Sequence, residues 1–204
     1  MNTVILIDAG TGILRSVQKA LERVGANVLR TDDPKKVLSG KRVVLPGVGA
    51  FGEFMSGLRQ RGLEDALQDI ARRSVPLLGI CVGMQALFDT GEEMGQHAGL
   101  RLLPGRVARF AGSLRVKIPH TGWNQIEVQV TEPLFCGLSS GAYVYFNHSY
   151  FCRPDESSHI AATTTHDLTY ACAVQRHHIY GVQFHPEKSQ SIGLQILKNF
   201  LEIQ

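Results

Sequence analysis

The segment Gly79-Ile80-Cys81-Val82-Gly83-Met84-Gln85 decides how this chain folds and where its chemistry lies. A short apolar run at residues 75–78 precedes it and predicts a buried strand, and an apolar run at residues 84–88 predicts the start of a helix. Cys81 is therefore expected at a tight strand-to-helix turn, with glycines on both sides that allow close packing and unusual backbone angles. A thiol at that point faces the N–H groups of the helix start, which favour a nucleophilic thiolate.

Cysteine is also a common filler of hydrophobic cores, so Cys81 alone proves little. The Gly-x-Cys-x-Gly frame favours the nucleophile, because it resembles the elbow of hydrolases in which the turn itself supplies an oxyanion donor. The other three cysteines, Cys136, Cys152 and Cys172, lack such a frame and are interpreted as structural. No pair has the Cys-x-x-Cys spacing of zinc sites, so neither a metal nor another cofactor is expected.

A second motif lies far downstream, at Gly181-Val182-Gln183-Phe184-His185-Pro186-Glu187. The proline after His185 fixes the local backbone and ends the preceding strand. A histidine and a glutamate two residues apart can then reach the same side, where the carboxylate would hold one tautomer of the imidazole. A lone histidine is usually a surface or core residue, but together with Cys81 this motif predicts a Cys-His-Glu hydrolase.

The bulk composition is that of one soluble domain spanning residues 1–204. The chain is 44% hydrophobic and 19% charged, with a net charge of +3. It has no run of Lys or Arg that predicts nucleic-acid or membrane binding, and its N-terminal apolar stretch is too short for a signal or a span. Four sparse cysteines fit a reducing compartment, so a cytoplasmic location is expected.

The predicted elements alternate in the first half of the chain and are mostly strands in the second. Strands are expected at residues 4–7, 27–30, 41–45 and 75–80, with helices at 13–24, from Asp32, at 51–59 and at 63–72. Further strands are expected at 107–110, 124–130, 142–146, 160–164, 171–175 and 179–184, and a last helix at 191–200. The order predicts an α/β fold: a mostly parallel, doubly wound sheet with a β-rich second half and an active site at the carboxyl strand ends.

Three further segments have both ordinary and functional interpretations. Pro46-Gly47-Val48-Gly49-Ala50-Phe51 is either a plain turn after a strand or a loop whose N–H groups face Cys81, and it lacks the Gly-Lys-Ser/Thr ending of a phosphate loop. The segment Phe146-Asn147-His148-Ser149-Tyr150 is either a loop whose polar groups hydrogen-bond to one another or a strand end that presents polar groups to a site. Lys117-Ile118-Pro119-His120-Thr121-Gly122-Trp123-Asn124 holds the sole tryptophan, which is either core or an interface anchor.

The cysteine and His-Pro-Glu motifs together resemble the class I (triad) glutamine amidotransferases. The Pro-Gly-Val-Gly, His-x-Gly-Trp-Asn and Gly-Val-Gln-Phe-His-Pro-Glu-Lys-Ser segments are similar to those of the glutaminase subunits of imidazole glycerol phosphate synthases, which serve histidine biosynthesis. The resemblance covers essentially the whole chain, from Asp8 to the last helix.

The resemblance implies a role for each matching residue. Cys81 would attack the side-chain amide of glutamine, His185 would move the protons, and Glu187 would orient His185. Oxyanion donors would come from Val82 and from Gly47, Val48 and Gly49. Residues that would hold the glutamine substrate are Gln85, His148, Ser149 and Tyr150.

The resemblance also implies a partner, a (β/α)8-barrel cyclase subunit that receives the ammonia and forms a heterodimer with this chain. Trp123, Asn124 and Lys188 are the expected docking residues. The chain departs from the family pattern after its first strand, where Ala9 and Ile13 replace a Tyr and an Asn, and at Asn147, where Val is common. These departures bear on the interface and on coupling to the partner, and leave the triad intact.

Three alternatives stay open at this point. An amidotransferase could serve another ammonia acceptor, although the His-x-Gly-Trp-Asn stretch argues against this. A catalytically silent subunit is opposed by the intact Cys81, His185 and Glu187. A thiol peptidase or stress protein on a related fold would leave the His-Pro-Glu motif and Trp123 unexplained.

Overall fold

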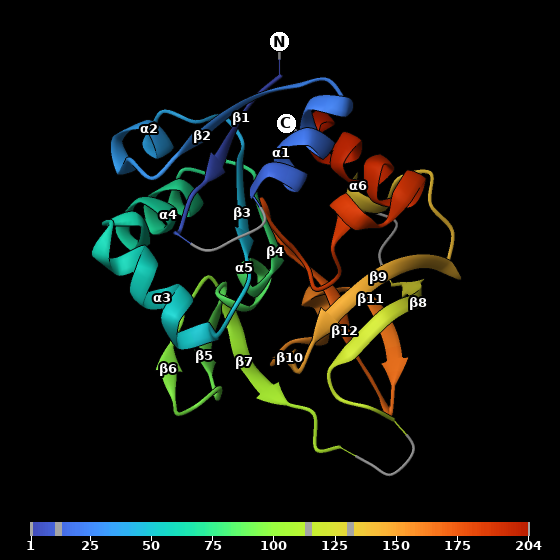
Figure 1. The fold of residues 1–204 in the computed structure, drawn as a ribbon. Coiled ribbons are helices and arrows are strands. Elements are labelled where there is room, and N and C mark those ends of the chain that lie inside the picture. Colours follow the sequence, from blue (N-terminus) through green and yellow to red (C-terminus); the bar gives the residue numbers. More distant parts are fainter. Residues whose placement is uncertain (1, 11–13, 113–115, 130–132, 204) are drawn as a thin grey trace.

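The computed structural model describes residues 2–10, 14–112, 116–129 and 133–203, and Figure 1 shows their arrangement. Ile13, one of the two departures from the family pattern near the N-terminus, lies outside the described residues, as does the last residue of the strand expected at 124–130.

One half of the fold is a parallel sheet, as the alternation of strands and helices predicts. Its strands lie side by side in the order β2 (Ala26–Thr31), β1 (Asn2–Ile7), β3 (Val43–Gly47), β4 (Leu77–Cys81) and β13 (Ile179–Val182). Each neighbouring pair in this series is parallel. β3 and β4 are buried at every position, as strands covered on both faces must be. Their carboxyl ends therefore meet at one edge, which holds the end of β3 and Cys81.

Helices cover both faces of this half. α1 (Leu14–Arg23) packs against α6 (Gln190–Glu202), while α2 (Pro34–Leu38) and α3 (Phe51–Gln60) contact α4 (Leu63–Arg72). Figure 1 shows these two groups on opposite sides of β1 and β3. α1 buries one stripe, with helical spacing at Leu14, Val17 and Leu21. The doubly wound α/β prediction is confirmed.

The second half is rich in strands, as predicted, and most of these strands pair antiparallel. Beyond β13 the sheet continues through β12 (Leu168–Arg176), β10 (Tyr150–Pro154), β7 (Leu103–Arg109), β5 (Phe88–Gly91) and β6 (His97–Ala98). A branch leaves β12 through β11 (Ile160–His166) to β8 (His120–Val128) and β9 (Ala142–His148). Short 3-10 turns lie at η1 (Pro133–Phe135), η2 (Ser157–His159) and η3 (Pro186–Lys188).

Several boundaries differ from the sequence prediction. The helix after Cys81, α5, is the single turn Val82–Gln85, and Phe88 begins β5 instead of extending that helix. An apolar run of this length suits a buried strand as well as a helix, and periodicity alone does not separate them. β13 stops at Val182, so Phe184 is not part of the strand. The pattern did not predict β10, a short strand in the sheet.

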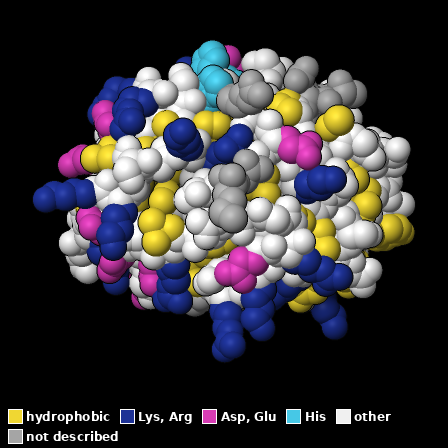
Figure 2. Space-filling model, turned by 90° about the horizontal axis from the view of Figure 1, so that it is seen from above, with side chains coloured by type: hydrophobic (Ala, Val, Ile, Leu, Met, Phe, Trp, Pro, Cys, Tyr) yellow, Lys and Arg dark blue, Asp and Glu magenta, His cyan; other side chains and the backbone are white. Residues whose placement is uncertain are grey.

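The surface shows no strong segregation of charge on the face seen in Figure 2, where Lys and Arg side chains are interspersed with Asp and Glu. Among the described residues, no helix is both long and apolar enough to cross a membrane.

Candidate active site

Cys81 sits on a strained turn at the carboxyl end of β4. Its φ of 55° and ψ of −113° lie in a region that non-glycine residues rarely occupy. Such strain costs on the order of 1–3 kcal/mol and persists where the surroundings enforce it. The flanking glycines are required by space: a Cβ at Gly79 would lie 2.6 Å from the Gly83 carbonyl oxygen, and one at Gly83 would collide with the Leu45 carbonyl oxygen. The turn is thus held in place by β3.

His185 and Glu187 form a buried pair beside this turn. Nδ1 of His185 lies 2.9 Å from Oε1 of Glu187, and their side chains are 4% and 1% exposed. Burial by itself lowers the pKa of His185, but hydrogen bonds to Cys81 and Glu187 outweigh it and raise that pKa to about 10. The imidazole is therefore protonated near neutral pH, with the Cys81 sulfur on one side and the Glu187 carboxylate on the other.

The backbone of His185 is fixed by the β-rich half of the fold. Its N–H donates to the Tyr145 carbonyl at 2.9 Å, and its carbonyl accepts from the Ser189 hydroxyl at 2.7 Å. That hydroxyl also accepts from the Tyr145 N–H at 3.0 Å. β9 therefore sets where the histidine stands relative to a cysteine carried by the parallel half.

Two glutamines connect the cysteine to the opposite wall of the site. Nε2 of Gln183 lies 3.7 Å from the Cys81 sulfur, and Oε1 of Gln183 accepts from Nε2 of Gln85 at 3.1 Å. The same Gln85 nitrogen lies 3.1 Å from the Tyr150 carbonyl. Both glutamines are buried. The motif quoted in the sequence contains Gln183, but a role for it became visible only in three dimensions.

A cavity of about 320 Å³ opens onto the Cys81 turn. Its lining residues are Val48, Gly49, Cys81, Val82, Gln85, Glu93, Pro119, Asn147, His148, Ser149, Tyr150 and His185. All four predicted substrate residues lie in this lining. The volume and polar lining suit a small polar molecule. Within the described ranges, no group of three or more His, Cys, Asp or Glu side chains is placed to hold a metal ion.

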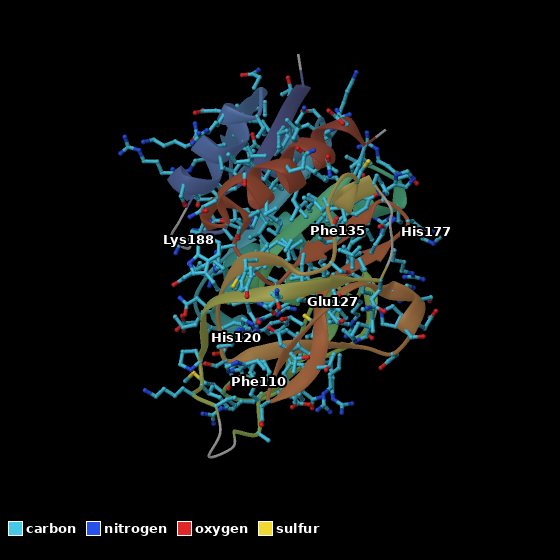
Figure 3. All side chains as sticks on the ribbon, turned by 90° about the vertical axis from the view of Figure 1, so that its right-hand side faces the viewer. Phe110, His120, Glu127, Phe135, His177 and Lys188 are labelled. Carbon is cyan, nitrogen blue, oxygen red and sulfur yellow. The ribbon has the colours of Figure 1, made fainter. Side chains whose placement is uncertain are left out.

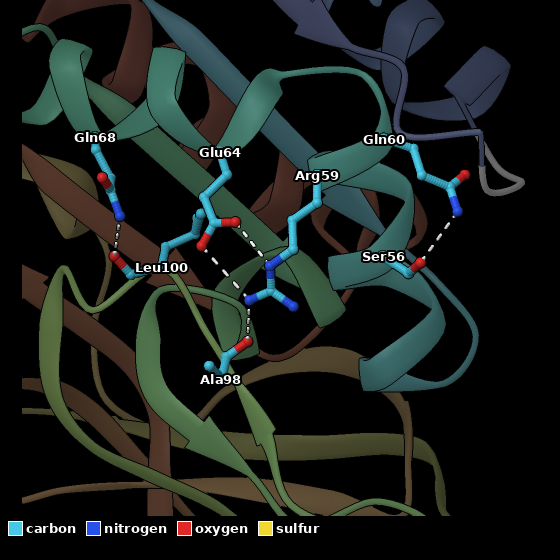
Figure 4. Close-up of polar contacts among 7 residues, drawn as sticks. All are labelled: Ser56, Arg59, Gln60, Glu64, Gln68, Ala98 and Leu100. Atoms are coloured by element: carbon cyan, nitrogen blue, oxygen red, sulfur yellow. Dashed lines mark hydrogen bonds and ion pairs between the residues drawn. The ribbon is translucent and has the colours of Figure 1, made fainter.

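Glu93, in the turn after β5, also lines the cavity, and no sequence motif predicts it. Its Oε2 accepts from the Phe51 N–H at 2.7 Å. The neighbouring strand is anchored to two helices: Arg59 bonds to Glu64 and to the Ala98 carbonyl, as Figure 4 shows. Gln68 reaches the Leu100 carbonyl at 3.4 Å. The hydrogen bond from the Phe51 N–H holds the carboxylate of Glu93 at the start of α3.

The glycine-rich loop lies next to the nucleophile. Gly47 pairs in register with Cys81, and a Cβ there would lie 2.7 Å from the Gly83 nitrogen. Gly49 has a φ of 91°, open to glycine but strained for other residues. Val48 and Gly49 line the cavity together with Val82. The segments predicted to supply oxyanion donors thus border one space.

A larger, more open hollow of about 760 Å³ lies at the end of β1 and contains none of the three triad residues. An ion pair of 2.6 Å joins Arg30 and Asp8 there. Burial raises the pKa of the Asp8 carboxyl, but the hydrogen bond to Arg30 holds it below its ordinary value. Ala9, the departure from the family pattern, is buried beside this carboxylate.

Two of the expected docking residues gather on one outer face. Trp123 is 46% exposed and meets the Tyr145 ring edge-on, with centroids 6.1 Å apart. The Lys188 nitrogen lies 5.5 Å from the centre of the same ring. Asn124 differs, because its amide nitrogen turns inward to the Thr165 carbonyl at 2.9 Å and to His120 at 3.3 Å. Asn147 bonds to Thr121 at 3.1 Å on the neighbouring strand.

The comparisons with known proteins agree with this arrangement. The family described as "Glutamine amidotransferase class-I" matches residues 5–203. The chain is 49% identical over 203 residues to the protein named imidazole glycerol phosphate synthase subunit HisH of Moorella thermoacetica, covering 100% of this chain and 96% of that protein. It is 48% identical over 202 residues to the protein of the same name from Syntrophotalea carbinolica, covering 97% and 98%. A crystal structure titled as a glutamine amidotransferase superposes with a TM-score of 0.76 at 21% identity, covering 98% of this chain and 99% of that one.

Proposed function

This chain belongs to the class I glutamine amidotransferases and, within them, to the HisH family, and we propose that it is the glutaminase subunit of imidazole glycerol phosphate synthase. It hydrolyses glutamine to glutamate and ammonia in histidine biosynthesis. The observation that carries the proposal is Cys81 on a strained turn, sharing one cavity with His185, whose other ring nitrogen is held by Glu187.

The reaction begins with a thiolate and an imidazolium. The raised pKa of His185 makes its imidazole a good acceptor for a proton from the Cys81 sulfur, and the sulfur acts as the nucleophile. The sulfur attacks the carboxamide carbon of glutamine, and the carbonyl electron pair moves to the oxygen. N–H groups of Val82 and of the Gly47–Gly49 loop bind this oxyanion. Each such donor contributes roughly 3 kcal/mol to the transition state.

His185 then releases the leaving group. The imidazolium gives its proton to the amide nitrogen, the carbon–nitrogen bond breaks, and ammonia departs, leaving a glutamyl thioester on Cys81. Neutral His185 next takes a proton from water, whose oxygen attacks the thioester. Glutamate leaves, and the thiolate and imidazolium return. Glu187 stabilises the cation in both steps and keeps Nδ1 protonated.

The cavity walls recognise the substrate. Glu93 offers a carboxylate for the α-ammonium group of glutamine, and the Ser149–Tyr150 segment lines the same cavity. Gln85 and His148 act differently from simple ligands. Their hydrogen bonds to the Tyr150 carbonyl hold the wall in place.

The ammonia passes to a (β/α)8-barrel cyclase subunit, which forms a heterodimer with this chain and makes imidazole glycerol phosphate and aminoimidazole carboxamide ribotide. Trp123 and Lys188 dock the partner, and Asn124 supports strand β8 through its hydrogen bonds to the Thr165 carbonyl and His120. The chain functions as a single amidotransferase domain over residues 1–204, in the cytoplasm, without a metal or other cofactor.

The test is glutamine hydrolysis by the purified chain, alone and with the cyclase subunit and its nucleotide ligand. Strong stimulation by the loaded partner supports both the chemistry and the pathway. Hydrolysis at the same rate with and without the partner supports the catalytic triad but means that the ammonia goes to another acceptor. Absence of hydrolysis in every condition rejects the glutaminase proposal.

A further inference from the structure

Behind the cavity wall, three ring side chains form a buried hydrogen-bonded line. Nδ1 of His120 and Nε2 of His148 each lie 2.9 Å from the hydroxyl oxygen of Tyr170. All three side chains are less than 8% exposed. They come from β8, β9 and β12, so no short sequence motif joins them. Phe110 packs edge-on against Tyr170, with ring centroids 5.3 Å apart, and Figure 3 shows it near His120 in the β-rich half.

The direction of every hydrogen bond in this line is determined. Burial lowers the pKa of His120 to about 4 and that of His148 to about 3, so both rings are neutral near pH 7. A neutral imidazole has one N–H donor and one acceptor nitrogen. Nδ1 of His148 faces the Tyr150 carbonyl at 2.8 Å and must donate, so its Nε2 accepts. Tyr170 therefore donates to His148 and accepts from Nδ1 of His120.

The hydrogen bonds at the Asn124 end of this line also have a single direction. With Nδ1 of His120 donating, its Nε2 accepts from the Asn124 amide at 3.3 Å. The Asn124 amide is itself oriented, because its oxygen accepts from the Gln125 N–H at 2.9 Å while its nitrogen donates to the Thr165 carbonyl. A one-way series thus runs from Asn124, next to Trp123 on β8, to the Tyr150 carbonyl at the cavity.

We propose that Tyr170 is a positioning residue: its hydroxyl, held between His120 and His148, fixes the orientation of the His148 ring, whose Nδ1–H donates to the Tyr150 carbonyl, and thereby the Tyr150 wall of the glutamine cavity. This rests on the proposed glutaminase function. Tyr170 does not line the cavity, so it acts on glutamine only through His148. Removing the hydroxyl leaves two buried ring nitrogens without their partner and frees His148 to turn or change tautomer.

The first test is Tyr170→Phe in the complex with the cyclase subunit, with the isolated wild-type complex assayed beside it. Phe keeps the ring packing and removes only the hydroxyl. The KM for glutamine is expected to rise roughly tenfold, with a smaller change in kcat, as expected for one lost buried hydrogen bond. NMR of histidine labelled with nitrogen-15 is expected to show the His148 Nδ1–H signature in wild type and its loss or mixing in the variant.

A matched control is Tyr180→Phe, which removes another buried tyrosine hydroxyl of the sheet, away from the cavity lining. Its KM and the His148 signals are expected to stay at wild-type values. An unchanged KM together with an unchanged His148 spectrum in Tyr170→Phe overturns the proposal. An inactive wild-type complex overturns the glutaminase assignment instead, and the His148 spectra still decide the positioning role.

A second pair of variants applies if Tyr170→Phe fails to fold. His120→Asn keeps an N–H donor near the position of Nδ1, while His120→Leu removes it. The proposal expects a KM near wild type for His120→Asn and a raised KM with an altered His148 signal for His120→Leu. Equal effects of the two substitutions on both readouts overturn it.

Discussion

Glu187 accepts a hydrogen bond from Nδ1 of His185 at 2.9 Å, and both side chains are almost fully buried. Because Glu187 raises the pKa of His185, Glu187→Gln is expected to lower that pKa from about 10. The imidazolium is then lost at a lower pH, so the alkaline limb of the kcat/KM profile moves toward neutrality. We expect kcat/KM at neutral pH to fall by roughly 10²-fold. A pH profile of glutamine hydrolysis measures both effects.

The pH dependence of protein stability gives a second test of the His185–Glu187 pair. The folded pKa of His185 lies above its ordinary value of 6.5, so the pair stabilises the fold fully below pH 6.5 and loses that effect as the pH rises toward 10. The difference in melting temperature between wild type and Glu187→Gln should therefore shrink across this window. Glu202→Gln, an exposed residue on α6, serves as the control. A constant difference from pH 6 to pH 10 contradicts the assignment.

Cys81→Ala is expected to abolish glutamine-dependent synthesis by the complex and to leave ammonia-dependent synthesis intact, because the cyclase subunit needs only the product of this site. Assays of product formation with glutamine and with ammonium salts measure the two separately. Cys136→Ala replaces an exposed free cysteine and is expected to leave both activities unchanged. Loss of both activities in Cys81→Ala means that the cysteine is structural or that the complex has not formed.

Gly83→Ala is expected to destabilise the fold strongly, because its methyl group would collide with the Leu45 carbonyl of β3. The comparison is Gly25→Ala, where φ is +93° but no atom lies within 4 Å of the added carbon. Conformational strain alone should cost Gly25→Ala about 1 kcal/mol of unfolding free energy. Gly83→Ala should cost several-fold more or fail to fold. Equal losses, measured by urea unfolding, would show that the elbow can relax away from β3.

Trp123→Ala is expected to weaken association with the cyclase subunit by roughly 30-fold, the cost of about 2 kcal/mol for an aromatic anchor. The exposed ring and its contact with Tyr145 carry this expectation. Titration calorimetry of the two subunits measures the dissociation constant. Leu29→Ala truncates an apolar side chain of similar exposure on β2, at the other end of the sheet, and should bind like wild type. Unchanged affinity in Trp123→Ala excludes it as an anchor.

Acid should destabilise the protein partly through His120, whose folded pKa of about 4 lies below its ordinary 6.5. As the pH falls, His120 therefore takes up a proton in the unfolded chain before it does so in the folded chain. The stabilisation that comes from the neutral His120 ring is complete above pH 6.5 and is lost as the pH falls toward 4. His120→Asn cannot titrate there, so its unfolding free energy should fall less between pH 7 and pH 4. Identical slopes contradict a neutral, buried His120.

The sequence predicted the parallel half of the fold well because its signals are local. β4 and the Cys81 turn follow from one apolar run and two glycines, and the structure adds why those glycines are needed: Gly83 lies against the Leu45 carbonyl. Local apolar patterning gave the wrong element just after Cys81. The apolar run at residues 84–88 suits a helix and a buried strand equally, and tertiary pairing of Phe88 with Leu103 decides for the strand.

Residues in a recognisable motif were expected to share one site and do lie around one cavity, whereas lining residues outside a motif were not anticipated. Glu93 lines the cavity and accepts from the Phe51 N–H, a contact between distant residues that no sequence motif marks. The line from His120 through Tyr170 to His148 joins three separate strands. Hydrogen bonds of this kind depend on register between distant segments, which composition and periodicity do not encode.

The position of β13 in the sheet has a consequence for how the protein is made. This strand lies between β4 and β12, with Ile179 beside Leu77, although the two are encoded far apart. A chain emerging from the ribosome presents Cys81 long before β13 exists, and closing so long a loop is slow. A nascent chain therefore carries the Cys81 thiol without its base until His185 has been synthesised and β13 has paired with β4.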